Sequence, residues 1–289
     1  MTRLSSPPLV RPIPNRESSS ASEMLNAVVL QRIKVSPGLA ILRVAPDDWD
    51  LKDFTPGQFA VLGLPESAPR CAMSDEEPDT GSDRMIKRAY SIASSSVSRE
   101  FLEFYVVLVP SGRLTPRLFA LSPGDRLWLG CKFSGLFTLD QVPDDQHLVL
   151  ISTGTGLAPY MSMLRTQLTC GGTRRFAVLH GARHSWDFGY RSELMTLSRM
   201  CSNFDYLPCI SRPVDELVPW SGQTGYIQDL WMRKPLEQLW NGSPSPENAH
   251  LFICGNPGMV ESMVELLGHE GFREHTKRQP GQIHVERYW

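Results

Sequence analysis

Long hydrophobic runs and an excess of charge of one sign are both missing from this sequence. No apolar stretch approaches the ~18 residues of a membrane-spanning helix, so no membrane partner is expected. The formal net charge of −2 gives no general argument for binding nucleic acid or an anionic surface. The hydrophobic content of 41% and charged content of 21% are instead typical of a soluble globular protein.

Paired cysteine motifs are missing as well. The six cysteines are scattered, with neither a C-x-x-C pair nor a Cys/His spacing suited to a metal. This distribution argues against iron–sulfur and zinc sites, and it favours a reduced, cytoplasmic setting over a disulfide framework. The cysteines are Cys71, Cys131, Cys170, Cys201, Cys209 and Cys254.

The first 24 residues lack the apolar segment of a secretory signal. They are rich in Ser, Pro and Arg, and their prolines would break the amphipathic helix of an organellar transit segment. We therefore expect residues 1–24 to be a disordered extension. The full 289 residues exceed the roughly 250 at which a single core stops growing, so two domains are expected.

Residues 25–143 read as short strands separated by turns, which predicts an antiparallel β-barrel. Apolar and polar residues alternate, and Pro-Gly pairs mark several turns. One short helix is expected over Thr115–Ala120. The expected strands are Ala27–Val35, Leu39–Val44, Gln58–Leu64, Arg88–Ala93, Leu102–Leu108 and Arg126–Gly130.

Residues 65–87 interrupt this pattern of short strands and turns. The stretch contains Pro65, Pro69 and the acidic run from Ser74 to Asp79, which is too polar and turn-rich for a core. We expect a long exposed loop. A tolerated insertion and an acidic docking loop are both compatible with it.

From residue 147 to residue 289 buried-type strands alternate with helical segments, which predicts an α/β domain with a parallel sheet. The boundary between the two domains is expected near Val142–Gln146. The expected strands are Leu148–Ser152, Phe176–Gly181, Phe204–Ile210 and His250–Cys254. The expected helices are Ala158–Cys170, Arg191–Cys201, Tyr226–Lys234 and Pro257–Glu270.

The stretch Arg88-Ala89-Tyr90-Ser91 is suited to holding a flavin. The Arg88 guanidinium can grip a phosphate with two parallel hydrogen bonds. Tyr90 offers an aromatic face, and the small Ser91 hydroxyl can approach a ring nitrogen. Taken alone, an exposed Arg and a half-buried Tyr on a strand are ordinary, so the rest of the chain must decide.

Two Gly-rich turns follow buried strands in the second domain. Gly154 and Gly156 lead into a helix expected near Pro159, and the turn Gly255–Gly258 leads into a helix near Met259. Glycines let a ligand approach the backbone, and a helix N-terminus attracts a pyrophosphate. Both turns are therefore candidates for binding a dinucleotide. We interpret Cys254 as a small packing residue beside a nicotinamide, since no His nearby in sequence supports a nucleophile.

Further cationic and aromatic residues fit a site for two cofactors. Arg113 and Thr115 could meet a second phosphate, although Thr115 could equally be a helix cap. Arg183 and Arg212 follow strands and could hold a 2′-phosphate, or they could be solvated surface residues. The terminal Tyr288-Trp289 pair would be stabilised by packing on a flavin or adenine ring, or in a protein groove.

In combination, these segments resemble the bacterial ferredoxin (flavodoxin)–NADP reductases over about residues 25–289. The resemblance implies an FAD-binding antiparallel barrel followed by an NADP-binding α/β domain. The segments that carry it are Arg88–Ser91, Leu102–Tyr105, Gly112–Leu118, Thr153–Pro159, Ala182-Arg183, Ser211-Arg212, Cys254–Pro257 and Glu286–Trp289.

The resemblance also implies roles for individual residues. For FAD these are Arg88, Ala89, Tyr90, Ser91, Tyr105, Val106, Val107, Leu108, Arg113, Leu114, Thr115, Thr155, Tyr288 and Trp289. For NADP they are Gly154, Gly156, Ala182, Arg183, Ser211, Arg212, Tyr226, Gly255, Asn256, Pro257 and Met259. Ser91, Cys254, Glu286 and Tyr288 are expected to act as geometric helpers, and no metal is expected.

The implied reaction is hydride transfer between NADPH and FAD, followed by single-electron exchange with a small acidic ferredoxin or flavodoxin. A cytoplasmic monomer is expected. Lys87, Arg113, Arg117, Lys277 and Arg278 are candidates for a basic docking rim.

Two departures from the family pattern keep alternatives open. Tyr226 stands where close members carry an arginine, and the acidic loop is longer than usual. Loss of one phosphate-facing cation weakens the argument for NADP. An NADH-preferring flavin or oxygenase reductase component, or a non-catalytic redox sensor, are the alternatives.

Overall fold

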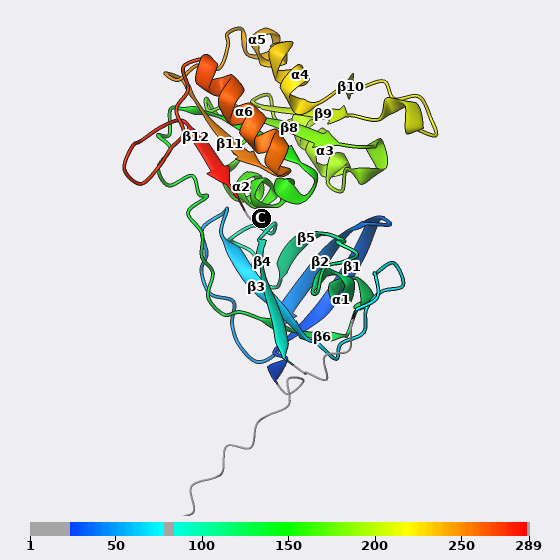
Figure 1. The fold of residues 1–289 in the computed structure, drawn as a ribbon. Helices are drawn as coiled ribbons and strands as arrows, with labels where there is room; N and C mark the ends of the chain where they lie inside the picture. Colours follow the sequence, from blue (N-terminus) through cyan, green and yellow to red (C-terminus); the bar gives the residue numbers. More distant parts are fainter. Residues whose placement is uncertain (1–23, 78–83, 288–289) are drawn as a thin grey trace, which may run out of the picture.

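The structure is a computed structural model that describes residues 24–77 and 84–287. It consists of two halves stacked end to end, with an antiparallel sheet in one and a parallel sheet in the other (Figure 1). The predicted fold class is confirmed. Residues 1–23 of the expected extension lie outside the described residues, as do Tyr288 and Trp289.

The first half is a six-stranded sheet in the order β4-β3-β6-β1-β2-β5. An isolated antiparallel bridge between Ile92 and Phe104 joins the segment after β4 to β5, which brings the two edges of the sheet together as in a barrel. The helix α1 (Thr115–Ala120) has the predicted bounds. The strands are β1 (Ala27–Ser36), β2 (Leu39–Pro46), β3 (Phe59–Pro65), β4 (Met85–Ser91), β5 (Leu102–Val107) and β6 (Arg126–Leu129).

The second half is a parallel sheet in the order β10-β9-β8-β7-β11-β12. Its strands are β7 (His147–Thr153), β8 (Phe176–Ala182), β9 (Phe204–Ile210), β10 (Gln223–Thr224), β11 (Ala249–Cys254) and β12 (Ile283–Glu286). The helices are α2 (Ala158–Gln167), α3 (Arg191–Met200), α4 (Ile227–Met232), α5 (Pro235–Trp240) and α6 (Pro257–His269).

Helices cover both faces of the parallel sheet because its strands are apolar on both sides. Along β7, Leu148 and Leu150 face the core that includes α2 and α3, whereas Val149 and Ile151 face α4, α5 and α6. The first of these cores continues into the barrel through residues such as Ile41. The two halves therefore share apolar packing.

Three short elements were absent from the sequence-based expectation: β10, α5 and β12. Two and four residues are too few for β10 and β12 to show periodicity, and β12 forms by pairing with β11. The helices α2 and α3 also end at Gln167 and Met200, before the cysteines at which they were expected to end.

The loop expected over residues 65–87 is shorter than expected, and its described part is bonded to the barrel although side chains such as Glu76 are exposed. Pro65 ends β3, and Met85 begins β4. Between them the Cys71 amide donates to the Pro116 carbonyl at 3.0 Å and the Asp75 amide to the Pro110 carbonyl at 3.1 Å. The chain packs beside α1, where Glu77 pairs with Arg117 of the helix and Glu66 pairs with Arg113 just before it.

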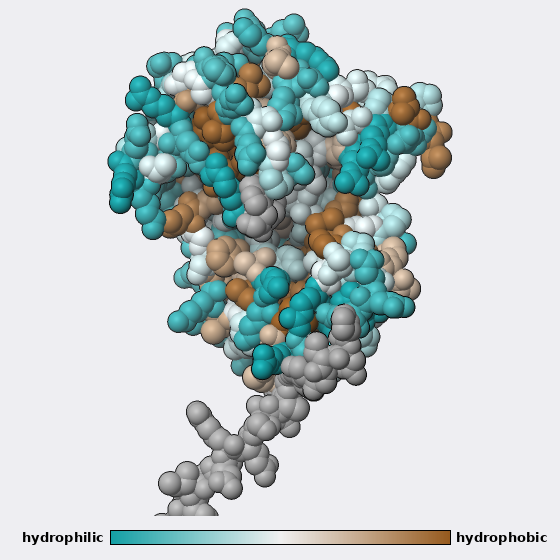
Figure 2. Space-filling view, viewed as in Figure 1, coloured by the Kyte–Doolittle hydropathy of each residue, from teal (hydrophilic) through white to brown (hydrophobic). Residues whose placement is uncertain are grey.

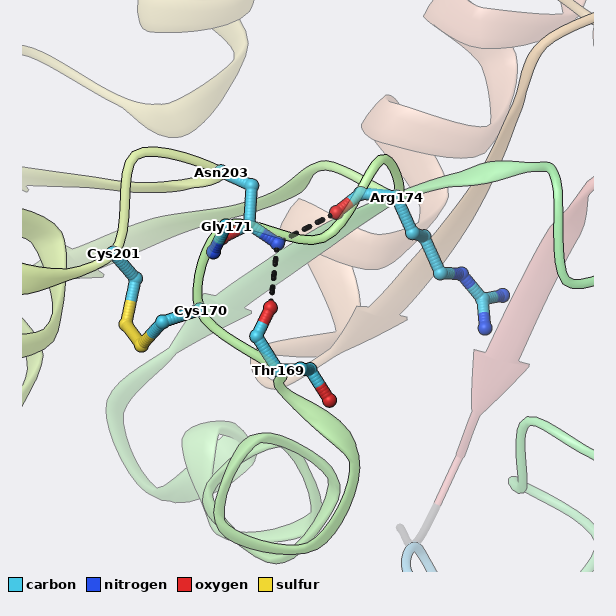
Figure 3. The surroundings of a disulfide bond; sticks show 6 residues. All are labelled: Thr169, Cys170, Gly171, Arg174, Cys201 and Asn203. Atoms are coloured by element: carbon cyan, nitrogen blue, oxygen red, sulfur yellow. Dashed lines mark hydrogen bonds between the residues drawn. A yellow bond between two sulfur atoms is a disulfide. The ribbon is translucent and has the colours of Figure 1, made fainter.

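The scattered cysteines favoured a reduced setting over a disulfide framework, yet the structure contains one disulfide. Cys170 and Cys201 form one, with their Cα atoms 4.5 Å apart (Figure 3). The bond joins the turn after α2 to the end of α3. Asn203 ties the same turn down by accepting from the Gly171 amide at 2.9 Å and donating to the carbonyls of Thr169 and Arg174. Because the two cysteines are 31 residues apart, only the tertiary fold brings them together.

Most of the surface in view is polar, with apolar groups in a few places (Figure 2). One lies on the loop after β9, which projects from the second half (Figure 1). Val214, Leu217 and Val218 are exposed there. Within the described residues, no helix is both long and apolar enough to cross a membrane.

Candidate active site between the two sheets

The strand β4 carries the predicted flavin motif at the edge of the barrel. The exposed Arg88 donates to the Lys87 carbonyl at 2.7 Å, and Tyr90 is half-buried against the barrel core. Burial raises the pKa of the Tyr90 hydroxyl, so it stays protonated. The strand therefore presents a guanidinium and a neutral phenol side by side.

Three predicted helper residues converge where the two halves meet. Ser91 at the end of β4 donates to Glu286 Oε2 at 3.0 Å, and the Cys254 thiol donates to the same oxygen at 3.5 Å. Glu286 and Cys254 are paired residues of β12 and β11. Burial raises the pKa of Glu286, and the two hydrogen bonds offset part of that shift.

The two Gly-rich turns of the second half lie against each other. A Cβ on Gly156 would lie 2.3 Å from the Cys254 carbonyl oxygen, and one on Gly255 would lie 2.3 Å from Thr153 Oγ1. That hydroxyl accepts from the Asn256 amide at 2.8 Å. The turns approach this closely because neither glycine has a side chain.

The first turn differs from the expected direct entry into an α-helix. Residues Gly154–Leu157 form a 3₁₀ turn, and α2 follows from Ala158. Gly154 has a φ of +55°, a conformation that favours glycine. At the second turn, the side chain of Asn256 accepts from the Met259 amide at 3.3 Å and caps α6.

The residues predicted to meet the 2′-phosphate lie at adjoining strand ends. The Ser211 amide donates to the Ala182 carbonyl and the Arg212 amide to the Arg183 carbonyl, each at 3.0 Å. Both arginines are exposed. Tyr226 is 69% exposed at the start of α4.

Carboxylates also surround these strand ends. Glu216 accepts from the amide and the hydroxyl of Ser185, at 2.7 and 2.6 Å. Asp187 and Asp215 each lie 3.4 Å from a ring nitrogen of His184. The region around the strand ends that carry Arg183 and Arg212 therefore has charges of both signs rather than only positive ones.

Arg113 and Thr115 are placed differently from a simple phosphate site. Arg113 pairs with Glu66, and its Nε lies 3.6 Å from Glu77. The Thr115 hydroxyl bonds the Val109 backbone, and the N-cap of α1 is Leu114. The alternative interpretation of Thr115 as a helix cap is therefore wrong.

Tyr105, predicted to line the flavin ring, lies between the two halves. It is 3% exposed, and its hydroxyl donates to the Asp187 carbonyl at 2.9 Å and accepts from the Gly189 amide at 3.1 Å. The neighbouring Val106 is buried, Val107 is exposed, and the Leu108 amide donates to the Gly38 carbonyl. Thr155 is half-buried in the first turn.

Known proteins resemble this chain over most of its length. The family model described as an oxidoreductase NAD-binding domain matches residues 150–265. A flavodoxin/ferredoxin–NADP reductase of Buchnera aphidicola (subsp. Baizongia pistaciae) is 31% identical over 83% of this chain and 89% of its own. The chain belongs to the flavodoxin/ferredoxin–NADP reductase family.

Two more relatives agree with this assignment. The Escherichia coli flavodoxin/ferredoxin–NADP reductase is 32% identical over 82% of this chain and 88% of its own. A Neisseria gonorrhoeae ferredoxin NADP⁺ reductase structure with bound FAD and NADP is similar, with a TM-score of 0.72 and 25% identity. That match covers 91% of this chain and 98% of the other. The predicted family is confirmed, and the predicted cofactors agree with those in the gonococcal structure.

Several residues at this reductase site escaped the sequence-based prediction. Glu66 pairs with Arg113 just before α1, Glu77 pairs with Arg117 of α1, and Glu103 with Arg165 bridges the two halves. Charge alternating with apolar residues around Glu103 would have suggested a solvent-facing side chain, yet it is 1% exposed. Its partners are distant in sequence, so no local signal reveals them. Arg117, expected in a docking rim, is 4% exposed and donates to Glu77 at 2.7 Å, which removes it from the rim.

Proposed function

We propose that this protein is an FAD-dependent reductase that moves electrons between NADP(H) and a ferredoxin or flavodoxin. The observation that carries the proposal is the junction of Ser91, Cys254 and Glu286, where the flavin-motif strand meets β11, which leads into the second nucleotide turn, and its neighbour β12. When both cofactors are bound, NADPH supplies a hydride and FAD accepts it and passes electrons on singly. The protein supplies binding, orientation and exclusion of water.

The residues in the barrel fit FAD. Among described residues, Arg88 donates to a single carbonyl, so most of its donors remain available for a phosphate. Arg113, Leu114 and Thr115 would meet the diphosphate from α1, with Arg113 exchanging Glu66 for phosphate. Ala89, Tyr90, Ser91 and the Val106–Leu108 backbone would flank the ring system, and Tyr105 would support it from behind. Thr155, Tyr288 and Trp289 are the further proposed contacts.

The residues in the parallel sheet fit a dinucleotide. Gly154, Gly156 and Gly255 would form a cradle beside the starts of two helices, and the lack of a Cβ at Gly156 and Gly255 lets the two turns pack against each other. Asn256, Pro257 and Met259 complete the second turn. Ala182, Arg183, Ser211, Arg212 and Tyr226 would receive the adenosine end. By this assignment residues 25–143 hold FAD and residues 147–289 hold NADP(H).

Glu286 holds the two small polar groups at the meeting point. Its carboxylate accepts hydrogen bonds from Ser91 and Cys254, which come from different halves. It therefore fixes the hydroxyl beside the flavin motif relative to the thiol beside the second turn. We assign these three residues a geometric role, with Tyr288 as a fourth member.

A small acidic electron carrier would dock on the basic residues that remain exposed. Lys87, Lys277 and Arg278 are exposed. Lys87 lies over the Trp128 ring with its Nζ 3.6 Å from the ring centroid, so its charge is held in place. With ferredoxin or flavodoxin as the acceptor, turnover should fall as the salt concentration rises, whereas with ferricyanide it should change little. This result would support docking of the carrier on this surface.

The test of the activity is direct. The purified protein should be yellow, should release FAD on denaturation, and should reduce ferricyanide with NADPH. Colourless protein that takes up no FAD would contradict the proposal. A protein that binds both cofactors yet transfers no hydride would instead be the redox sensor considered above.

The choice between NADPH and NADH has a specific observation on each side. Arg183 and Arg212 favour a 2′-phosphate, whereas Tyr226 supplies no cation and Asp215 lies nearby on the loop after β9. We assign NADPH because two cations flank one strand-end junction. A kcat/KM ratio of NADPH to NADH below one would reverse this assignment in favour of the NADH-using reductase.

A further inference from the structure

A buried ionic cluster joins the two halves and lies next to Tyr105, one of the residues assigned above to FAD, whose ring packs against the Tyr190 ring. Its centre is Glu103 of β5, which is 1% exposed. Arg43 of β2 donates to Glu103 Oε2 and Arg165 of α2 donates to Oε1, each at 2.7 Å. The Tyr190 hydroxyl donates to Oε1 at 2.9 Å. A barrel carboxylate is therefore held by groups from both halves.

Arg165 makes more of these connections than any other member of the cluster. Besides Glu103, it donates to the Ala93 carbonyl at 2.9 Å, and both carboxylate oxygens of Glu193 accept from it at 2.7 Å. Ala93 lies two residues beyond Ser91, and Glu193 lies on α3. One guanidinium thus contacts the barrel twice and a neighbouring helix in a bidentate pair.

The buried charges in this cluster are paired with charges of opposite sign. Burial alone would raise the pKa of Glu103, but Arg165, Arg43 and Tyr190 hold it below its usual value. A buried carboxylate that remains ionised requires its cationic partner to stay in place. If the two halves separated, Glu103 would lose its ion pair with Arg165.

The helix α2 links this cluster to the nucleotide turn. The turn at Gly154–Leu157 immediately precedes α2, and Arg165 lies in its last turn. Beside Arg165, the Thr166 hydroxyl accepts from the Ser96 amide at 3.1 Å and bonds the Ser95 hydroxyl at 3.0 Å. One rigid ten-residue helix therefore touches the nucleotide turn at one end and the segment after the flavin motif at the other.

We propose that Arg165 is a positioning residue that fixes the nucleotide turn relative to the flavin motif. Hydride transfer demands that two rings bound to different halves meet in one geometry, and a displacement of about 1 Å can slow a reaction on the order of a hundredfold. Arg165 sets that geometry through α2 without touching either cofactor. This inference rests on the proposed function for its kinetic consequence, whereas its structural consequence stands alone.

The kinetic experiment uses Arg165→Met in the FAD-loaded protein. Stopped-flow bleaching of the flavin at saturating NADPH should slow by roughly ten- to a hundredfold. FAD content and the Kd for NADP⁺ should change by less than about twofold, because neither binding site contains Arg165. Arg165→Lys, which keeps the charge but loses the fork, should restore part of the rate.

A matched control is available on the same half. Arg174 is also largely buried, but it donates to the Gln146 carbonyl at 2.8 Å, in the segment between the halves. Arg174→Met should leave the bleaching rate unchanged. If Arg165→Met fails to fold, Glu193→Gln weakens the bidentate pair and should slow bleaching in the same direction by a smaller factor.

A second readout is independent of activity. The Ser96 amide donates across the junction, so its hydrogen exchange in the flavin-free protein reports separation of the halves. Exchange at Ser96 should accelerate in Arg165→Met and not in Arg174→Met. Unchanged exchange and an unchanged bleaching rate would overturn the inference. A rate loss fully explained by weaker FAD or NADP⁺ binding would overturn it too.

The two proposals fail in different ways. If the wild-type protein shows no NADPH-dependent bleaching, the proposed function fails, and the Ser96 exchange still decides whether Arg165 holds the halves together. If the wild type is active and Arg165→Met is equally active, the positioning role alone fails.

Discussion

Ser91 donates a hydrogen bond to Glu286 across the junction of the two halves, with 3.0 Å between the oxygens. The residues are 195 positions apart, and each ends a strand of a different sheet. The bond brings the flavin motif to the strand beside the second nucleotide turn. Burial of the Glu286 carboxyl group also raises its pKa, which gives this position a distinct pH dependence.

Glu286→Gln should change the pH dependence of stability. Burial raises the folded-state pKa of Glu286 above its unfolded value of about 4.3. The associated stability is fully present below the unfolded pKa and is lost as pH rises through the folded pKa. The neutral amide removes this loss, so the variant should gain Tm relative to the wild type at pH 7 but not at pH 4. Thermal melts at both pH values provide the measurement; an equal Tm difference at the two would contradict the assignment.

Gly156→Ala should damage the nucleotide cradle. The new Cβ would lie 2.3 Å from the Cys254 carbonyl oxygen, so the turns must separate. We expect a loss of about 1–3 kcal/mol in the free energy of unfolding, as for overpacked sites, with weaker NADP⁺ binding. Urea unfolding and NADP⁺ titration measure the two effects. The control is Gly38→Ala, whose Cβ would meet open space among described residues; equal behaviour of the two variants would argue against the cradle.

Tyr226→Arg should strengthen the preference for NADPH. The side chain is 69% exposed beside the strand ends that carry Arg183 and Arg212. A hydrogen bond to a charged group contributes about 1.5–3 kcal/mol, so we expect roughly a tenfold or greater rise in the NADPH to NADH ratio of kcat/KM. Tyr226→Phe serves as the control for the aromatic ring. A ratio unaffected by the arginine would place the 2′-phosphate elsewhere.

Cys170→Ser should destabilise the second half without altering the cofactor sites. The disulfide closes a loop of 31 residues, for which the chain-entropy relation gives about 3–4 kcal/mol. Denaturant unfolding of the wild type should show a similar loss on adding a reductant. Cys131→Ser, at an exposed residue, is the control. Identical unfolding with and without reductant would show that the disulfide does not form in the purified protein.

The periodic elements could be predicted from sequence because their own residues determine them. Alternation in β1 to β6 and the apolar runs of β7 and β11 mark the strands within one or two residues, apart from the earlier start of β4. The Gly-rich turns were also visible, since close approach and a left-handed φ both demand glycine. Such signals are local.

The remaining features depend on contacts between distant residues. Glu286 sits on a four-residue strand that forms only against β11. Arg113 appeared to be available for a phosphate because its partner, Glu66, lies 47 residues earlier. Arg165 and Glu103 meet only after both sheets are in place. Composition likewise did not reveal that two carboxylates of the 65–87 segment, Glu66 and Glu77, pair with arginines, whereas Asp75 and Glu76 are exposed as expected.

Anaerobic stopped-flow mixing of the FAD-loaded protein with NADPH tests the central claim most directly. The visible flavin absorbance should bleach completely with single-turnover kinetics that saturate with NADPH, and adding oxidised ferredoxin or flavodoxin should restore it. The second-order rate constant for flavin bleaching should be lower with NADH than with NADPH. A flavin that stays oxidised at saturating NADPH would contradict the assignment of this protein as an NADPH-dependent reductase.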